Sequence, residues 1–533
     1  MSRESEVGVG VMKGRGATKG KKCRQPRKRG PRPTREEAKK RRLKYRTAQR
    51  ALREKQLLEG LCPIQRTTAT NSSSCHKTQE EEAAERQRVV AAFIASVRPQ
   101  LPALLQALSN IKDPRDPKKI THQFALVMFY GIMCFVFQMQ SRREGNRDLS
   151  GPVLVDHLRQ IFPEIEGLPH HDTVNRILTE IDVEEIQDVH MAMIKRLIRN
   201  KKFNRFLING HYPIAIDGTQ KLLSNSLISP EWQERTYNKE TPDEHTKYNV
   251  YVLEAHLSFA NGLTLPLLSE FLNYEEGDNE AKKQDCETKA FQRLAKRLKE
   301  NFPRLPIIVL LDGLYPNGPI FETCRQHHWD FMIVLKDGSL PSIWTEFSAL
   351  KPLEPGNRAE RTAGVRRQIF QCVNDIEYFY GDDKKFVKLH VVECQERWDV
   401  VDSETSELAL QTSRHVWTSN KPLTKQNLHE RCNLAARHRW NIEEAILAEK
   451  RHGYQYEHGF SKDWKALKGY HYLMHLGRAL NVLAQYSEAL VDFVQTKGVR
   501  AAIKFIRDSL VHPWISPAEL LASLPDTPQL RLA

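Results

Sequence analysis

Hydrophobic residues recur at helical spacing through residues 79–205, with few β-branched runs. This periodicity predicts a helical domain. Within it, the stretch FALVMFYGIMCFVF (Phe124–Phe137) is almost wholly apolar but shorter than the roughly 20 residues that a bilayer-spanning helix needs. We therefore expect a buried helix there, and no membrane partner. The stretch LPHHDTVNRILTEID predicts a further short helix capped by Asp172 or Thr173, and this region is our candidate for a DNA-binding helix pair, with ordinary helix packing as the alternative.

From residue 212 the pattern changes to strands. YPIAID is a short apolar strand, and the apolar runs at 248–259 and 263–272 flank Asn261-Gly262. An Asn-Gly pair between two such runs predicts a β-hairpin.

Helix-linked strands follow the hairpin. Residues 280–300 and 317–328 have helical character, whereas 305–312 and 329–336 are apolar strand-like runs. Alternating stretches then predict a β-rich insertion, and helices follow from about residue 426. This order predicts an α/β fold, a mixed sheet flanked by helices, behind a helical N-terminal domain. The predicted divisions are a basic tail and linker (1–78), a helical, DNA-binding N-terminal domain (79–210), the first part of a core (211–337), a β-rich insertion (338–425), the rest of the core (426–490) and a C-terminal helical tail (491–533).

Charge is concentrated at the N-terminus. The chain carries a formal net charge of +15, and residues 1–56 hold 21 Lys and Arg against 5 Asp and Glu, so the rest is nearly neutral. A block such as KKCRQPRKRGPRP is typical of a disordered segment whose partner is a polyanion, most commonly nucleic acid. A solvated terminus or a targeting signal is the alternative. We expect Arg35–Leu58 to become helical on contact with DNA.

The nine cysteines form no Cys-x2-Cys pair, and no apolar signal core opens the chain. These features argue against a zinc ribbon or a disulfide scaffold, and favour a reducing compartment such as the cytoplasm.

Two apolar strands end in an acid followed by glycine, Asp217 in IAIDGTQ and Asp312 in VLLDGLYP. Asp-Gly is also an ordinary turn signal, and Asp337-Gly338 is a third copy. Nevertheless, ligands usually bind at the carboxyl ends of strands in open sheets. Two carboxylates from neighbouring strands and a third from a helix can hold two divalent cations, which clamp the attacking and leaving oxygens of a phosphodiester.

The stretch RWNIEEAILAEK supplies the third acid. Arg439, Glu443 and Lys450 fall on one face of a predicted helix. We expect Glu443 to bind metal, and Arg439 and Lys450 to contact the DNA phosphates that flank the reacting bond. The alternative is an exposed helix with an ordinary i,i+4 ion pair.

Asp217, Asp312 and Glu443, in this order, resemble the Asp-Asp-Glu transposases of bacterial insertion sequences. The likeness is closest to the IS4-like branch, with its Tyr-x2-Arg-x3-Glu-x6-Lys signature, in which Ala436 stands here at the Tyr position. The DPR run before an apolar helix and LPHHDTVNRIL before the first acid are also similar. The resemblance covers roughly residues 100–490.

The resemblance implies a ribonuclease-H-like catalytic core and two Mg²⁺ or Mn²⁺ ions as cofactor. It also implies DNA transposition on double-stranded DNA, both the terminal inverted repeats of the element and the target. The protein would then act as a homodimer on DNA in the bacterial cytoplasm, associated with the nucleoid. In that family the Tyr helps to handle a flipped base or end nucleotide, a role that Ala436 cannot fill.

Several alternatives stay open. Glu444 and Arg451 repeat the seven-residue spacing, but Trp440 stands where an Arg is required. A transposase-derived DNA-binding or regulatory protein, or a nuclease without strand transfer, would have a similar sequence. Two next-door histidine pairs, His170-His171 and His327-His328, are predicted not to bind metal because neighbours on a strand or helix point apart.

Overall fold

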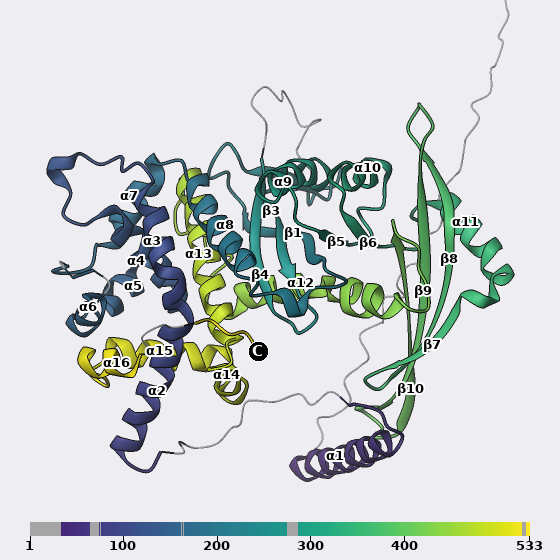
Figure 1. The fold of residues 1–533 in the computed structure, drawn as a ribbon, viewed down its shortest axis with the longest axis horizontal. Helices are drawn as coiled ribbons and strands as arrows, with labels where there is room; N and C mark the ends of the chain where they lie inside the picture. The colour runs from purple at the N-terminus through teal and green to yellow at the C-terminus, as the bar shows by residue number, and fades with distance from the viewer. Residues whose placement is uncertain are drawn as a thin grey trace, which may run out of the picture. The chain divides into compact units, whose positions relative to one another are not determined.

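The computed structural model describes residues 34–63, 74, 76–160, 162–163, 165–273, 286–524 and 529–533. Within them the chain is α/β, with a large mixed sheet and helices (Figure 1). Most of the basic tail, and residues 64–73 of the predicted linker, lie outside the described residues.

The helical pattern of residues 79–205 is confirmed. The stretch Phe124–Val136 is a helix in which nearly every residue is buried, as its uninterrupted apolar sequence predicts. A helix also spans the range expected at the end of the basic tail, where Thr34 forms a capping box with Glu37. These helices are α1 Arg35–Leu58, α2 Gln79–Val97, α3 Leu101–Ser109, α4 Phe124–Val136, α5 Arg142–Leu149, α6 Pro152–Leu158, α7 His171–Glu180 and α8 Glu184–Arg199.

The predicted cap of α7 is wrong. His170 is the N-cap, with extended backbone, and its Nδ1 accepts the Asp172 backbone N–H at 3.2 Å. Asp172 and Thr173 therefore lie in the first turn, where Asp172 complements the helix dipole.

The core of the sheet is mixed. β1 pairs in parallel with β5, β5 pairs in parallel with β6, and β3 runs antiparallel to β1 and β4. The predicted hairpin joins β3 and β4, and Gly262 takes the positive φ (+89°) that its turn requires. The strands are β1 Tyr212–Ser224, β2 Gln233–Tyr237, β3 His245–Ser258, β4 Thr264–Leu272, β5 Ile307–Leu311 and β6 Asp330–Val334.

The β-rich insertion is present and extends the same sheet. The strand order is β2-β3-β1-β5-β6-β10-β9-β8-β7, because the last insertion strand pairs antiparallel with β6. The insertion also contains a helix, α11 Pro341–Leu350, that the alternating pattern did not predict. Its strands are β7 Arg358–Ala363, β8 Arg366–Tyr380, β9 Lys385–Val401 and β10 Leu408–Ser419.

Helices that precede the insertion in the chain and helices that follow it both pack on the sheet. α13 contacts α4, α7, α8 and β4, and so joins the N-terminal helices to the sheet (Figure 1). The remaining helices are α9 Glu287–Asn301, α10 Gly318–His327, α12 Trp440–Arg451, α13 Trp464–Gln485, α14 Val491–Lys497, α15 Val499–Val511 and α16 Pro517–Ser523.

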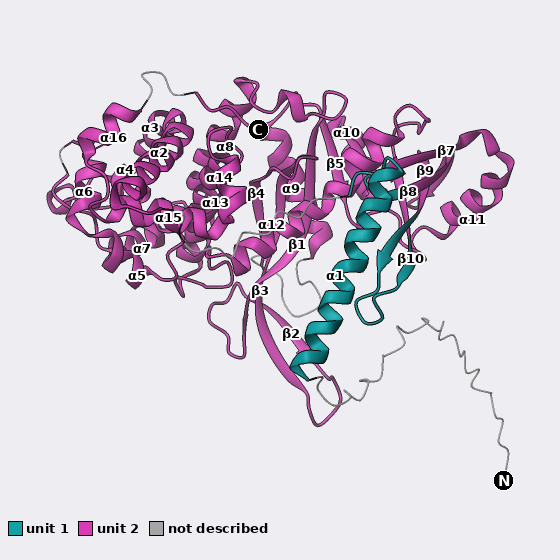
Figure 2. Ribbon diagram, turned by 90° about the horizontal axis from the view of Figure 1, so that it is seen from below, with its two compact units in different colours: residues 1–63, 363–366, 397–412 teal, residues 64–362, 367–396, 413–533 magenta. Residues whose placement is uncertain are grey.

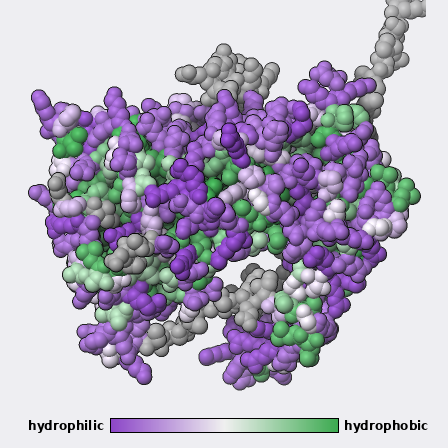
Figure 3. All heavy atoms as spheres, in the orientation of Figure 1, coloured by the Kyte–Doolittle hydropathy of each residue, from purple (hydrophilic) through white to green (hydrophobic). Residues whose placement is uncertain are grey.

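One continuous helical stretch, Gln79–Ser109, is long and apolar enough to cross a membrane by length and composition, and 44% of its most apolar window is buried inside the protein. Such a stretch is equally typical of a buried core helix. On the face drawn in Figure 3, hydrophilic residues predominate and hydrophobic residues appear as separate patches between them.

Two compact units divide the chain (Figure 2). The smaller contains α1 with residues 363–366 and 397–412, and in it Lys55 pairs with Asp399 at 3.3 Å. The larger contains residues 64–362, 367–396 and 413–533, and includes all three predicted catalytic acids.

Candidate active site

Asp217 and Asp312 lie at the same level of the sheet. Ala215 of β1 pairs with Leu310 of β5, and each acid stands two residues further along its strand direction. Asp312 follows the end of β5, as predicted. The prediction that the first strand ends at Asp217 is wrong, because β1 continues to Ser224 through its pairing with β3. Glu443 lies in the first turn of α12, which packs against β1.

Arg439 connects two of the acids. Its guanidinium donates to Asp217 Oδ2 at 3.3 Å and to Glu443 Oε1 at 2.7 Å, and the Arg439 side chain is only 5% exposed. Arg439 belongs to a short 3-10 segment, Ala436–Arg439, that precedes α12. The Arg439–Glu443 ion pair is therefore present. It is not an isolated pair on an exposed helix, because Arg439 also contacts Asp217 of the sheet.

The pKa of Asp217 is affected by both of the other acids. Burial raises the pKa of Asp217 to about 6; the Arg439 guanidinium opposes this rise, and the negative charges of Glu443 and Asp312 add to it. Burial and the neighbouring negative charges disfavour the ionised form of this carboxyl group. A bound cation would favour the ionised form again.

Asp312 is turned towards a hollow of about 430 Å³ that Glu443, Arg439 and Trp440 also line. The Leu314 backbone N–H donates to its Oδ1 at 2.8 Å, and Lys336 Nζ lies 2.9 Å from Oδ2. Asp312 thus retains access to solvent, since about a quarter of its side chain is exposed.

Lys450 lies at the far end of α12 from Glu443. Its Nζ donates to the Gln220 carbonyl of β1 at 2.9 Å and lies 3.3 Å from Glu457. Its cation therefore has protein partners, and it ties α12 to β1.

The competing acids are placed differently. Asp337 also lines the hollow beside Asp312, but it is exposed and pairs with Arg414 at 2.9 Å. Glu444 lines a different hollow, together with Arg478 and Tyr486. Neither is among the main causes of the shifted pKa of Asp217.

A fourth acid, Glu287, was not predicted. It is the first residue of α9, and it accepts hydrogen bonds from the hydroxyls of Tyr251 at 2.7 Å and Tyr315 at 3.0 Å. A Cβ added at Gly218 would lie 2.8 Å from Glu287 Cδ, so this acid packs directly beside the residue that follows Asp217. The sequence places Glu287 inside a helix predicted over 280–300, and that position carries no sign of tyrosine partners.

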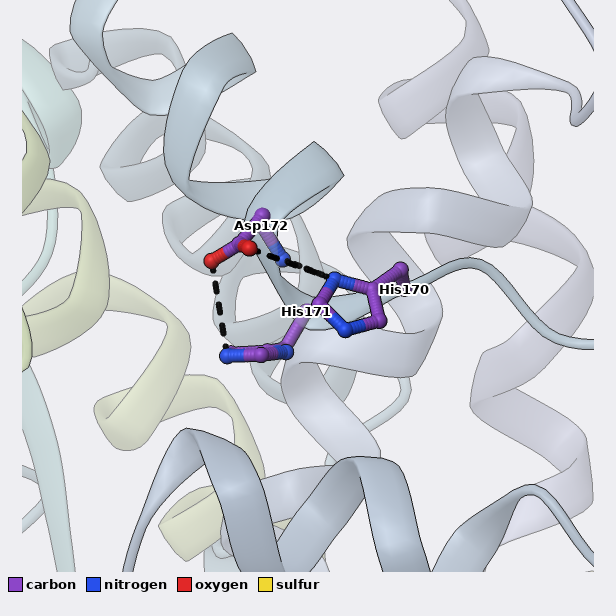
Figure 4. Close-up of side chains that lie close together, drawn as sticks. All are labelled: His170, His171 and Asp172. Atoms are coloured by element: carbon purple, nitrogen blue, oxygen red, sulfur yellow. Dashed lines mark hydrogen bonds and ion pairs between the residues drawn. The ribbon is translucent and has the colours of Figure 1, made fainter.

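His170 and His171 do not point apart, contrary to the prediction. The His170 and His171 rings lie 4.2 Å apart, because the helix boundary falls between the two residues, and both approach Asp172 at 3.4 Å (Figure 4). Their ligand atoms and that of Asp172 lie within 4.8 Å of one another. Among the described residues, His327 and His328 join no such group.

A protein-family model described as DDE_Tnp_1-associated matches residues 105–194, from within α3 to within α8. This match indicates a DDE-type transposase family and a transposase-related function. The matched range ends before the three acids. No match was found among the curated proteins.

Proposed function

We propose that the chain is a DNA transposase with a ribonuclease-H-like core, of the IS4-like branch. It catalyses metal-dependent phosphodiester hydrolysis at element ends and transfers the freed 3′-end into target DNA. The observation that carries this proposal is the convergence of Asp217, Asp312 and Glu443 from two neighbouring strands and a facing helix.

The donor set fits hard divalent cations. All three side chains offer carboxylate oxygens, which Mg²⁺ and Mn²⁺ prefer. The raised pKa of Asp217 is the expected sign of acids placed for a cation. When bound, two such ions would activate a water or 3′-hydroxyl and stabilise the departing oxyanion.

Protein groups around the acids prepare the site. Arg439 fixes the oxygens of Asp217 and Glu443 towards each other, and Lys336 holds one oxygen of Asp312. We retain Arg439 and Lys450 as the groups that contact DNA phosphates. Both cations have protein partners in the structure, so phosphate contact requires those partners to exchange.

The proposed partners are double-stranded DNA at the terminal inverted repeats and at the target, with a homodimer bridging two ends in the bacterial cytoplasm. The basic tail supports a polyanionic partner, because its 21 cations outnumber its acids fourfold.

The test is a cleavage and joining assay. The full-length protein is incubated with DNA that carries the inverted repeats flanking its gene, with Mg²⁺ or with a chelator. We expect nicks at the repeat ends and joined products only with the metal ion. Nicks without joined products would instead indicate a nuclease.

The second candidate is a transposase-derived DNA-binding protein without catalytic activity. The favouring observations are that Arg439 and Lys336 already neutralise part of the acidic charge, and that Ala436 replaces the signature Tyr. Specific binding of the repeat DNA, with no cleavage at any Mg²⁺ or Mn²⁺ concentration, would favour this candidate over the enzyme.

A further inference from the structure

A second group of ionisable side chains is enclosed between β3, α12 and α13. Glu254 and His256 come from β3, Glu449 from α12 and His475 from α13. None of the four is more than 2% exposed. We call these four residues the buried cluster.

The ligand atoms of Glu254, His256 and His475 lie within 4.8 Å of one another, close enough to share one ion, and Glu449 lies beside this group. His256 Nε2 lies 2.7 Å from Glu254 Oε2, and His475 Nε2 lies 3.6 Å from the same oxygen. Glu449 Oε2 is 4.0 Å from His475 Nε2. Two ligands of a tetrahedral zinc ion, each about 2.0–2.2 Å from the metal, stand roughly 3.3–3.6 Å apart, so side-chain rotations, of Glu449 above all, would complete such a site.

Several atoms of the buried cluster have no hydrogen-bond partner. Within the described part of the chain, His475 Nε2 and both carboxylate oxygens of Glu449 neither donate nor accept one. Arg478 Nε approaches Glu449 Oε1 only to 3.7 Å. Buried polar atoms are nearly always satisfied, so unpartnered atoms directed at one point call for a missing ligand.

Neighbouring groups orient the ligands inward. The Tyr456 hydroxyl donates to Glu254 Oε1 at 2.5 Å, which leaves Oε2 for the cluster. Ser269 Oγ lies 3.4 Å from His475 Nδ1, which leaves Nε2 free to face the carboxylates. Hydrogen bonds on the outer atoms of metal ligands commonly fix them in this manner.

We propose that the buried cluster binds one divalent transition-metal ion of the zinc class, with Glu254, His256, Glu449 and His475 as its four ligands. Two neutral imidazoles and two carboxylates suit zinc in number and in type. The two carboxylate charges balance the ion, and the cations of Arg478 and Lys221 lie beside the acids.

The ion has a structural role. It ties the strand beside Asp217 to the helix that carries Glu443, because Glu254 is the cross-strand partner of Asp217 and Glu449 lies on α12. It therefore fixes the distance between two catalytic candidates without touching them. The site does not depend on the proposed transposase activity, since its ligands are separate from the three acids.

The experiment measures the metal content of the full-length protein by mass spectrometry, after zinc loading and removal of unbound metal. We expect about one zinc ion per chain, and a fall in melting temperature when the ion is stripped. His256→Ala and His475→Ala should each lose the ion. Asp217→Asn should keep it, which separates this site from the catalytic one.

The matched control is His157→Ala. His157 is also buried, but its ring nitrogens lie 3.0 and 3.1 Å from the carbonyls of Leu510 and Ile515. This variant should lose stability and keep its zinc. X-ray absorption of the wild-type protein at the zinc edge provides a measurement that needs no variant, and it should show two imidazole ligands.

Three results would overturn the proposal: wild-type protein without zinc, zinc retained in both ligand variants, or an absorption spectrum without imidazole. The exposed group His170, His171 and Asp172 (Figure 4) is the alternative zinc site. Zinc that disappears in the double variant His170→Ala/His171→Ala, and persists in His475→Ala, would assign the ion to that surface and refute the buried site.

Discussion

Asp217 is the residue whose surroundings say most about the site. Its side chain is about one-fifth exposed, and its pKa is raised from 3.8 to about 6, mainly by burial, even though Arg439 donates to it. The folded chain therefore binds a proton at Asp217 between about pH 4 and pH 6, where the unfolded chain has released it.

This difference predicts a pH-dependent effect of Asp217→Asn in metal-free protein. Because the folded state binds more protons in that window, the free energy of unfolding of the wild type falls as pH rises from 4 to 6. The variant avoids this loss, so at pH 7 it should be more stable than the wild type by about 1–3 kcal/mol. The advantage should shrink as the pH falls through 6 and should approach zero only below about pH 4, as measured by denaturant unfolding with a chelator present.

Asp337→Asn is the control, since Asp337 is exposed and its ion pair with Arg414 lies at the surface. It should change stability by less than about 1 kcal/mol at either pH. If Asp217→Asn gave no gain at pH 7, the close approach of the three acids would be in doubt.

For single residues, the sequence predicts contacts between neighbours in the chain better than contacts between distant segments. The Arg439–Glu443 contact follows from the four-residue spacing, and it is present. That the same guanidinium also reaches Asp217, 222 residues earlier, depends on how α12 packs against β1. Glu287 has no local signal at all, because its two tyrosine partners come from β3 and from the loop after β5.

Among the elements, the contact between β1 and the start of α9 leaves no room for a side chain at Gly218. A Cβ at Gly218 would lie 2.7 Å from Tyr251 Cε1 and 2.9 Å from Glu287 Oε1. Real Cβ atoms do not approach that closely, so either the tyrosine or α9 must move.

Gly218→Ala should therefore destabilise the protein by about 1–3 kcal/mol and reduce DNA cleavage, since the strain falls next to Asp217. Thermal unfolding and the cleavage assay measure the two effects. Gly356→Ala is the matched control, because a Cβ at Gly356 meets nothing within 4 Å and its φ is not positive. Equal stability of the two variants would show that the strand and helix are not in tight contact.

The elements themselves were largely predictable where periodicity was strong. α4, the β3–β4 hairpin and β5 follow from apolar runs and turn residues. The length of β1 does not, because its pairing with β3 carries the strand past Asp217-Gly218. α11 was missed because its ten residues lie within a stretch of alternating pattern. The buried cluster could not be predicted, since Glu254 and His475 are brought together only by the packing of α13 on the sheet.

For the whole molecule, the dominant feature is the uneven charge. Residues 1–33 alone carry 11 Lys and Arg against 2 Asp and Glu. Cations that neutralise phosphates release counterions, so they contribute affinity that falls steeply with salt.

Deletion of residues 1–33 should lower the affinity for double-stranded DNA by about 10-fold or more at 0.15 M salt, and should flatten the dependence of affinity on salt. Fluorescence anisotropy over a salt series measures both. A tail of the same composition in scrambled order should restore binding if the contribution is electrostatic. An unchanged salt slope after deletion would exclude the tail from the DNA interface.

The central claim is that three separated carboxylates form one metal-dependent site for DNA cleavage. The most direct measurement compares Mg²⁺-dependent cleavage of the element ends by Asp217→Asn, Asp312→Asn and Glu443→Gln with that of the decoy variants Asp337→Asn and Glu444→Gln. We predict a loss of about 10³-fold or more in each of the first three, with DNA binding retained, and near wild-type rates in both decoys. Wild-type cleavage by any of the first three variants would contradict the account.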